Sequence, residues 1–322
     1  MIVVTGAAGF IGSNLAHELR GEELLLVDHP LTPAKAANLA GLPAFRFQEH
    51  EAFLADLEAD QHQPRAIYHL GACSATTEQD WDYLLRNNVE YTRRLWAWCT
   101  RRDIPFVYAS SAATYGDGAR GFSDATSPED LTPLNLYGKS KNDFDRWALR
   151  QDQTPPRWAG VKFFNVYGPR ESHKGRMASV AYQTYQQIAR TGGMKLFRST
   201  DAAYPDGGQL RDFVYVRDCV RHLLWLANAN HAGGLYNSGT GRARSFFDLA
   251  SAVFAALDRA PAIGFIDMPA DLAKQYQNFT QADMGKLRVA GCKLPATSLE
   301  EGVREYVGGI AERNQRASSG ND

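Results

Sequence analysis

The sequence predicts an α/β protein in which a Rossmann-type, doubly wound parallel sheet is followed by a smaller C-terminal α/β substrate domain. Three observations lead to this prediction. The β-branched run at residues 2–5 leads directly into a glycine turn and then into a helical segment. Short apolar runs then alternate with helical stretches to about residue 165, which is typical of βαβ units. Beyond that point the loops lengthen and the alternation becomes irregular, which indicates a second domain.

The expected strands and helices define the domain boundaries. Strands are expected at residues 2–5, 24–27, 44–48, 66–69, 106–109 and 158–164, with helices at 13–20, 49–58 and 81–102 between them. In the second half, helices are expected at 177–190, 216–229 and 298–306, and strands at 195–197, 234–237 and 263–266. We therefore predict a nucleotide-binding domain over residues 1–165, a substrate-binding domain over 166–312 with chain crossovers between the two, and a frayed tail over 313–322.

Composition and charge exclude several classes of protein. A net charge of −1 with mixed signs gives no basic surface for nucleic acid or for a membrane. No apolar run approaches the ~18 residues of a membrane span, and the chain begins with a strand instead of a signal peptide. The four cysteines are far apart and form no Cys-x-x-Cys pair, which predicts reduced thiols and no metal site. We expect a cytoplasmic protein.

The glycine turn after the first strand has the context of a dinucleotide-phosphate loop. Gly6 permits the tight turn, Gly9 lets the backbone approach a pyrophosphate, and Gly12 lets helix and strand pack closely. The spacing is Gly-x-x-Gly-x-x-Gly, which by itself also fits any turn that needs small residues.

An acidic residue, Asp28, ends the second strand, roughly twenty residues after the glycine turn. An acid at this place can accept hydrogen bonds from an adenosine ribose and favours NAD over NADP. Lys35 could instead pair with a 2′-phosphate, or could be a solvated loop charge. The preference between the two dinucleotides is open at this point.

Tyr137 and Lys141 are one helical turn apart, and Asn135 can cap the helix that carries them. A free phenol has a pKa of about 10. Since a nearby ammonium favours the phenolate, Lys141 is expected to bring Tyr137 into the range of a useful base. Without further context the same pair would be ordinary surface residues.

Two segments follow the ends of predicted strands and should lie near this pair. The small residues at 70–74 can flank a flat cofactor, with Cys73 as a packing residue, and the hydroxyl cluster at 110–116 should lie beside Tyr137.

Six motifs spread along the chain occur together. They are residues 5–12 (Thr-Gly-Ala-Ala-Gly-Phe-Ile-Gly), 68–72, 87–89, 110–116, Tyr137-x-x-x-Lys141 and 164–170 (Phe-Asn-Val-Tyr-Gly-Pro-Arg). With these motifs the chain resembles the extended short-chain dehydrogenase/reductase superfamily over nearly its whole length.

Further stretches resemble, within this superfamily, the family of ADP-heptose 6-epimerases. They are residues 71–78, 108–116, 168–180, 211–216, 237–241 and 279–283. The resemblance implies an isomerase that acts on an ADP-heptose for lipopolysaccharide inner-core synthesis and holds NADP tightly, with NAD as the alternative. It implies that hydride leaves C6 of the heptose and that the transient ketone turns over before hydride returns to its other face. It also implies a homo-oligomer, with a pentamer as one candidate.

The same resemblance assigns roles to individual residues. Tyr137 and Lys174 match the two acid/base residues, Ser111 would hydrogen-bond the reacting oxygen, and Lys141 would hold the nicotinamide ribose. From the sequence alone, Lys174 would be a solvated loop lysine. The residues matched to cofactor contacts are Gly6, Gly9, Phe10, Ile11, Gly12, Asp28, His29, Lys35, Leu70, Gly71, Ala72, Cys73, Ser74, Asn87, Lys141, Val166 and Lys174. Those matched to the sugar nucleotide are Asn165, Arg176, Phe197, Arg198, Ser199, Thr200, Arg211 and Tyr276.

Two of the sugar-nucleotide residues have a physical rationale of their own. The guanidinium of Arg211 suits a pyrophosphate in bidentate fashion. Tyr276 offers a ring face for the adenine, although a buried core tyrosine fits the sequence equally well.

Three positions depart from the family pattern. His50 stands where related chains carry a lysine near the cofactor, which makes the NADP preference less secure. Arg176 replaces a serine beside the substrate, and residues 201–209 form a longer loop than usual before Arg211.

Two alternative functions are open on the sequence. A UDP-hexose 4-epimerase would need one tyrosine base and would have no need of a second acid/base residue at Lys174. A non-catalytic dinucleotide-binding sensor would typically have lost Tyr137 or Lys141, and both are present.

Overall fold

The computed structural model describes residues 1–269 and 276–319, with the side chains of the last helix described as far as residue 311. The chain divides into two compact units. The first comprises residues 1–163, 219–238 and 283–294, and the second comprises residues 164–218, 239–282 and the chain from 295 onward.

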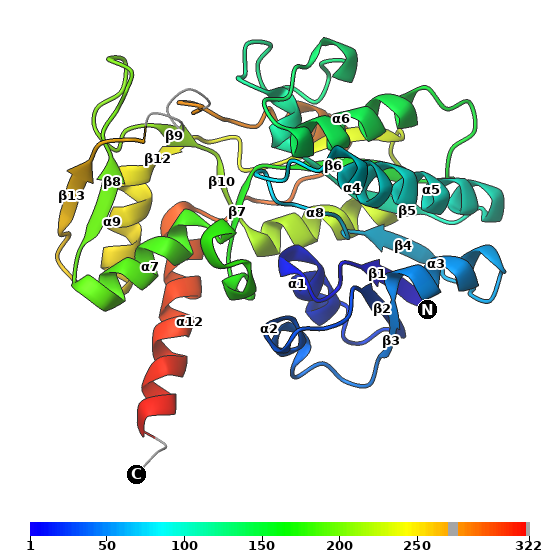
Figure 1. Cartoon of the computed structure of the whole chain (residues 1–322), viewed down its shortest axis with the longest axis horizontal. Coiled ribbons are helices and arrows are strands. Elements are labelled where there is room, and N and C mark those ends of the chain that lie inside the picture. Colours follow the sequence, from blue (N-terminus) through cyan, green and yellow to red (C-terminus); the bar gives the residue numbers. More distant parts are fainter. Residues whose placement is uncertain (270–275, 320–322) are drawn as a thin grey trace. The chain divides into compact units, whose positions relative to one another are not determined.

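A seven-stranded parallel sheet runs through the first unit (Figure 1). The strands lie in the order β11-β6-β5-β4-β1-β2-β3, and each neighbouring pair is parallel. Their bounds are β1 (Ile2–Thr5), β2 (Leu24–Asp28), β3 (Arg46–Glu49), β4 (Ala66–His69), β5 (Phe106–Ser111), β6 (Trp158–Phe163) and β11 (Gly234–Ser238). Strand order reverses beside β1, which is where such sheets bind nucleotides. This architecture confirms the predicted Rossmann-type fold.

Helices cover both faces of this sheet. In Figure 1, α4 (Trp81–Leu84), α5 (Tyr91–Arg102) and α6 (Leu136–Leu149) lie on one face, and α1 (Phe10–Glu18) and α8 (Val216–Asn228) lie on the other. A wider π-helical turn joins α4 to α5, which confirms the helix expected over residues 81–102. The shorter helices of this unit are α2 (Pro33–Ala36), α3 (His50–Glu58) and α11 (Gly285–Val289).

Helix α1 begins earlier than predicted, at Phe10 instead of residue 13. Gly9 precedes it in an extended conformation, so the glycine turn closes within four residues. The last glycine of the motif, Gly12, therefore lies inside the helix and not in the turn.

The core between the sheet and helices α3, α5 and α6 is aromatic. The ring of Trp96 lies 4.8 Å from that of Trp158 and 6.1 Å from those of Phe106 and Phe144, measured between centroids. Edge-to-face contacts of this kind add to the free energy gained by burying the rings. They fix α6 against β5 and so fix the direction of the side chains that α6 presents to the sheet edge.

The second unit contains short two-stranded sheets and three longer helices. β7 (Asn165–Tyr167) pairs with β10 (Phe213–Tyr215), β8 (Met194–Phe197) with β13 (Ile263–Ile266), and β9 (Leu210–Arg211) with β12 (Arg244–Ser245). Its helices are α7 (Val180–Thr191), α9 (Phe246–Ala256) and α12 (Leu299–Ser319).

Within the predicted second half, the chain crosses between the two units, and α12 runs into the predicted tail. Residues 219–238 and 283–294 belong to the first unit, because the fully buried strand β11 pairs with β6 of the large sheet. The tail was expected to fray from residue 313, but α12 continues to Ser319, since residues 310–319 contain no proline or glycine. Residues 320–322 lie outside the described residues.

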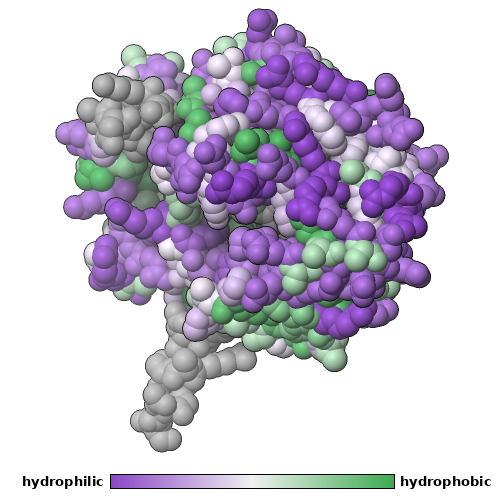
Figure 2. All heavy atoms as spheres, turned by 45° about the vertical axis from the view of Figure 1, so that its right-hand side comes forward, coloured by the Kyte–Doolittle hydropathy of each residue, from purple (hydrophilic) through white to green (hydrophobic). Residues whose placement is uncertain are grey.

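The face of the molecule seen in Figure 2 is mostly hydrophilic, with small separate apolar areas. Among the residues that the structure describes, no helix has the length and apolarity needed to cross a membrane. The same residues contain no group of His, Cys, Asp or Glu side chains that could hold a metal ion. The cysteines Cys73, Cys99, Cys219 and Cys292 are free thiols.

Candidate active site

The glycine turn at the carboxyl end of β1 is packed too closely for side chains. Gly6 has φ +63°, and a Cβ atom there would lie 2.6 Å from the backbone nitrogen of Gly71. A Cβ atom on Gly12 would lie 2.1 Å from the carbonyl oxygen of Gly6. Phe10 and Ile11 form the first turn of α1, whose leading N–H groups are the kind that bind phosphate. The turn therefore fits a dinucleotide pyrophosphate.

The buried carboxylate of Asp28 accepts hydrogen bonds from three donors at the end of β2. Oδ2 accepts from the Ala8 backbone nitrogen at 2.9 Å, and Oδ1 accepts from the His29 nitrogen and from Lys35 Nζ, both at 2.8 Å. Asp28 thus ties the glycine turn to β2. Lys35 is its ion-pair partner and is not the isolated loop charge that the sequence left open.

Two histidines lie beside this ion pair. The ring centroids of His29 and His50 are 3.9 Å apart. Burial, with a contribution from His50, lowers the pKa of His29. Three basic side chains, those of His29, His50 and Lys35, therefore come together at the end of β2, although His50 replaces the lysine of the family pattern.

The loop at residues 70–74 follows β4 and is held by Asn88, a residue to which the sequence analysis gave no role. Asn88 Oδ1 accepts from the Cys73 backbone nitrogen at 2.8 Å, and Nδ2 donates to the Cys73 carbonyl at 3.0 Å and to Ser140 Oγ at 2.9 Å. The preceding residue, Asn87, was matched to a cofactor contact. Its side chain donates to the Tyr83 carbonyl, one turn earlier in the same helix. Asn88 therefore links the loop to α6.

Tyr137 lies in the first turn of α6, which Asn135 caps as predicted, with Oδ1 accepting from the Gly138 nitrogen at 2.8 Å. Burial raises the pKa of Tyr137, and a hydrogen bond from the Ser111 hydroxyl opposes this rise. The direction is opposite to the lowering that the sequence predicted from Lys141. Desolvation of the phenol exceeds the influence of its neighbours in the protein.

Lys141 lies one turn further along α6 and is buried. Its Nζ donates to the carbonyl oxygen of Ala109 at 2.9 Å. Burial lowers the pKa of Lys141 to about 8, and the carboxylate of Asp145 opposes this shift. The ammonium therefore titrates close to the working range of an enzyme.

In the second unit, Lys174 and Arg176 lie on a short helical segment, Ser172–Met177. The buried carboxylate of Glu171 organises this segment, because it accepts hydrogen bonds from the Gly168 nitrogen at 3.2 Å and from Ser179 Oγ at 2.7 Å. Burial lowers the pKa of Lys174, with Glu171 opposing. Lys174 is half-buried, whereas Arg176 is exposed.

Asn165 and Val166 stand at the start of β7, next to a carboxylate with many partners. The Asn165 nitrogen donates to the Asp212 carbonyl at 3.1 Å. The side chain of Asp212 is fully buried and accepts from Thr240 Oγ1 at 2.7 Å and from the Ala282 nitrogen at 3.0 Å. Asp212 connects three segments of this unit and lies directly after Arg211.

Arg211 is buried between two aromatic rings. Its guanidinium carbon lies 5.1 Å from the centroid of Tyr276 and 5.4 Å from that of Phe246. It donates to the carbonyl oxygens of Leu210 and Gln277. None of the salt bridges between described residues includes Arg211, so the site suits an anion such as a pyrophosphate.

The segment from Phe197 to Thr200 ends β8 and is held by the long loop that follows it. Arg198 donates to Asp206 at 2.9 Å, and the Ser199 nitrogen donates to the same carboxylate at 2.9 Å. Arg198 therefore already has a carboxylate partner, in contrast to Arg211.

The structure thus collects the predicted residues in two groups, one in each unit. The first holds the glycine turn, the end of β2, the loop at 70–74 and the Ser111, Tyr137 and Lys141 side chains. The second holds Asn165, Val166, Lys174, Arg176, the segment at 197–200, Arg211 and Tyr276. The sequence analysis missed the buried polar residues that hold these segments, namely Asn88, Glu171 and Asp212. All three residues lie within the motifs at 87–89, 168–180 and 211–216, and this was the available signal.

Comparison with known proteins places this geometry in a family. Residues 2–239 match the model of the NAD dependent epimerase/dehydratase family. The chain is 48% identical to the ADP-L-glycero-D-manno-heptose-6-epimerase of Nitratidesulfovibrio vulgaris, covering 95% of this chain and 97% of that one. It is 47% identical to the enzyme of the same name from Alkalilimnicola ehrlichii, covering 97% and 98%.

A solved structure gives the same picture at the level of the fold. The crystal structure of Helicobacter pylori ADP-L-glycero-D-manno-heptose-6-epimerase superposes with a TM-score of 0.82 and 26% identity, over 96% of both chains. The chain belongs to the NAD dependent epimerase/dehydratase family.

Proposed function

We propose that this protein converts ADP-D-glycero-D-manno-heptose into ADP-L-glycero-D-manno-heptose by inverting C6, and so supplies a precursor of the lipopolysaccharide inner core. The observation that carries this function is the identity of 47–48% with 6-epimerases of this substrate over nearly the whole chain. The hydrogen bond between Ser111 and Tyr137 supports it, because a tyrosine beside a hydroxyl donor can take the proton of an alcohol during its oxidation.

The cofactor of the proposed reaction is NADP, with NAD as the alternative. The close-packed glycine turn would hold its pyrophosphate, and the basic side chains of His29, Lys35 and His50 would suit a 2′-phosphate. When bound, the nicotinamide supplies the acceptor and the donor of a hydride. Lys141 would hold the adjoining ribose.

Tyr137 and Lys174 are the acid/base residues of this proposal, one for each face of C6. One residue takes the hydroxyl proton as hydride leaves C6, which forms a ketone at that carbon. After the ketone turns, hydride returns to the opposite face of C6 and the other residue gives a proton to the oxygen. Ser111 hydrogen-bonds the oxygen throughout, and no atom is gained or lost.

The sugar nucleotide is assigned to the second unit. Arg211 would pair with the pyrophosphate through its planar guanidinium, which lies beside the rings of Phe246 and Tyr276. Tyr276 would stack on the adenine, and Asn165, Arg176 and residues 197–200 would contact the sugars. A cytoplasmic location and a homo-oligomer, with a pentamer as one candidate, stay predictions.

The test is a proton NMR assay of purified protein with ADP-D-glycero-D-manno-heptose and no added cofactor. The expected result is the appearance of the C6 epimer, which requires dinucleotide retained through purification. A spectrum unchanged in folded protein even after NADP is added would contradict the assignment of substrate, and UDP-hexoses would then be assayed.

A further inference from the structure

A buried carboxylate lies on the same face of α6 as the two predicted active-site side chains. Tyr137, Lys141 and Asp145 follow one another at intervals of four residues, so each is one helical turn from the next. Asp145 is fully buried. Its carboxylate accepts hydrogen bonds from Tyr108 at 2.9 Å and from Ser110 at 2.7 Å.

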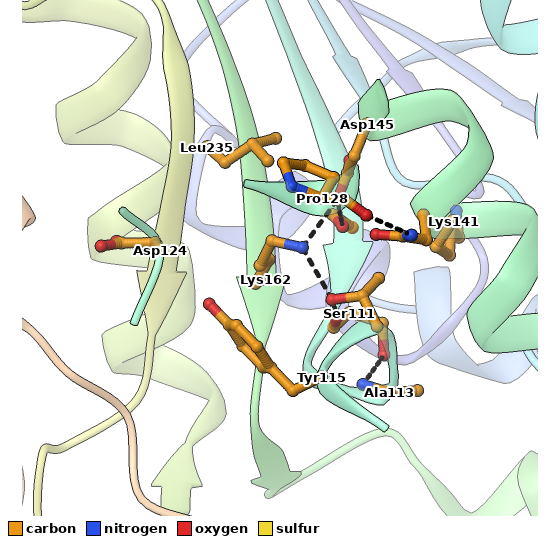
Figure 3. A network of polar contacts seen from close by, with 12 residues as sticks. Ser111, Ala113, Tyr115, Asp124, Pro128, Lys141, Asp145, Lys162 and Leu235 are labelled. Carbon is orange, nitrogen blue, oxygen red and sulfur yellow. Dashed lines mark hydrogen bonds and ion pairs between the residues drawn. The ribbon is translucent and has the colours of Figure 1, made fainter. Parts of the chain in front are cut away.

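The third partner of Asp145 is a lysine with no solvent exposure. Lys162 Nζ lies 2.8 Å from the Asp145 carboxylate, and both side chains are 0% exposed. The ammonium also donates to Thr114 at 2.6 Å and lies 5.1 Å from the centre of the Tyr115 ring. Figure 3 shows Lys162 between Asp145 on one side and the segment with Ser111 on the other. A buried pair with these hydrogen bonds is strongly coupled, because removing either partner leaves the other charge unpaired.

Strand β5 connects this pair to the proposed active site. Tyr108 and Ser110 project to Asp145, and the carbonyl of the residue between them, Ala109, accepts the hydrogen bond from Lys141. The next residue, Ser111, hydrogen-bonds Tyr137. Residues 108–111 of β5 thus contact both the Asp145–Lys162 pair and the Tyr137–Lys141 pair.

Apart from the Asp145–Lys162 pair, the titratable groups that interact with Lys141 from β4, the loop after it and α6 are uncharged at neutral pH. His69, from β4, has its pKa lowered to about 3 by burial, and burial raises the pKa of Cys73. Burial also raises the pKa of Tyr137. The carboxylate of Asp145 is therefore the anion that favours the protonated form of Lys141, and it also disfavours the phenolate of Tyr137.

We propose that Asp145 and Lys162 are positioning residues of the reaction: the Asp145 carboxylate, one helical turn from Lys141 and hydrogen-bonded to Tyr108 and Ser110 of β5, supplies the negative charge beside the Tyr137–Lys141 pair, and the Lys162 ammonium, 2.8 Å from that carboxylate, offsets part of this charge. Neither residue touches the substrate in this proposal. The two charges act on the Tyr137–Lys141 pair in opposite directions, so the two removals have opposite consequences. This proposal rests on the proposed function only for its kinetic readout.

The test follows the titration of Lys141 directly by NMR of protein labelled with 13C at the lysine Cε. The resonance absent from Lys141→Met is assigned to Lys141. In the parent protein its midpoint should lie near pH 8. In Asp145→Asn the midpoint should fall by about one pH unit, and in Lys162→Met it should rise, because the Asp145 charge is then unopposed.

Two further variants serve as controls. The first tests whether an unpaired buried charge disturbs the fold, and the second tests whether removing any charge from α6 shifts the midpoint. Asp145→Asn combined with Lys162→Met leaves no unpaired buried charge, and its midpoint should still fall, because Lys141 loses the carboxylate that lies one helical turn away. Asp143→Asn removes the partner of Lys139 on the exposed face of the same helix and should leave the midpoint unchanged. An unchanged Lys141 midpoint in the folded double variant, or shifts of the same sign in the two single variants, would overturn the proposal.

The pH profile of kcat gives the second readout. Both limbs should move to lower pH in the double variant, because both Lys141 and Tyr137 lose the influence of the carboxylate. If the parent protein does not epimerise the ADP-heptose, the proposed function fails while the NMR titration still decides the role of Asp145. If the Lys141 midpoint shifts but the pH profile of kcat does not, the proposed role of Asp145 and Lys162 in the reaction would be overturned.

Discussion

Tyr137 has an environment that protects a neutral phenol until a reaction requires its proton to move. Its pKa is raised by burial and restrained by Ser111, so a phenolate forms only with additional positive charge nearby. Lys141 is one source of that charge, and an oxidised nicotinamide would be a second. Tyr137 is therefore suited to act as an acid/base when the dinucleotide is bound.

The Tyr137→Phe variant should lose about a thousandfold in kcat, because the ring remains while the acid/base group is removed. Its fold and its binding of dinucleotide should be unaltered, which circular dichroism and calorimetric titration with NADP would check. Turnover within tenfold of the parent would contradict the role of Tyr137.

Lys174→Met should reduce kcat by a similar factor, since each direction of the reaction needs both acid/base residues. The variant that combines it with Tyr137→Phe should be scarcely slower than either single variant, because removing one member already stops the cycle. Losses that multiply in the double variant, measured by the same NMR assay, would show that the two residues act in one transition state and would contradict their assignment to opposite faces of C6.

At the scale of elements, the glycine turn and the start of α6 set the geometry of the first unit's site. Both depend on local interactions that single substitutions can remove. For the turn, another glycine of the chain should tolerate the same substitution, and for the start of α6, a conservative replacement of the capping residue should restore the parent behaviour.

Gly12→Ala should abolish dinucleotide binding, because its Cβ would lie 2.1 Å from the Gly6 carbonyl and push the turn apart. Gly21→Ala is the control, since no atom lies within 4 Å of a Cβ at that position. The measurement is NADP affinity by calorimetry. Equal affinities in the two variants would contradict this account of the turn.

Asn135→Ala should lower the free energy of unfolding by about 1 kcal/mol, because the Gly138 N–H loses its cap. The first turn of α6 should fray, and kcat should fall with it because Tyr137 lies in that turn. Asn135→Ser keeps a capping oxygen and should restore both stability and kcat. The measurement is urea unfolding, and an unchanged midpoint in Asn135→Ala would contradict the role of the cap.

Local patterns explain why much of the fold could be predicted and why some of it could not. β1, β2 and β4 are short apolar runs next to recognisable turns, and the Asn135 cap lies beside the helix that it starts. By contrast, a strand was expected at residues 234–237, but its place in the large sheet depends on pairing with β6, about 75 residues earlier in the chain. No local pattern reveals such a partner.

The same limit applies to the candidate site. The glycine turn and the Tyr137–Lys141 pair are each contained in one short motif. The Asp145–Lys162 and Asn88–Cys73 contacts instead join residues from different elements. The sign of the Tyr137 shift was wrong in the prediction because the burial of the phenol depends on tertiary packing.

For the whole molecule, stability should fall steeply in acid because two histidines are buried in the neutral form. Burial lowers the pKa of His69 to about 3 and that of His222 to about 4, against 6.5 for the unfolded chain. Below about pH 6.5 the unfolded state binds protons that the folded state does not, so stability is lost as the pH falls toward these values. Each residue should account for roughly 3 kcal/mol between pH 7 and pH 4.

Urea unfolding at several pH values would check this expectation. His222→Gln should flatten the pH dependence of the free energy of unfolding between pH 6.5 and pH 4. The variant lacks the imidazole that hydrogen-bonds Ser238 in the folded protein and takes up a proton in the unfolded chain. A parent-like slope in that variant would show that other groups cause the acid sensitivity.

In the proposed reaction, hydride leaves C6 and returns to the same carbon within one bound complex. The most direct test is to incubate the protein with ADP-D-glycero-D-manno-heptose deuterated at C6 and to analyse the epimer by NMR and mass spectrometry. The account predicts that the product retains the deuterium at C6 in ordinary water, because the hydride never exchanges with solvent. An epimer that has lost its deuterium would contradict the account and indicate inversion by removal of a proton from carbon.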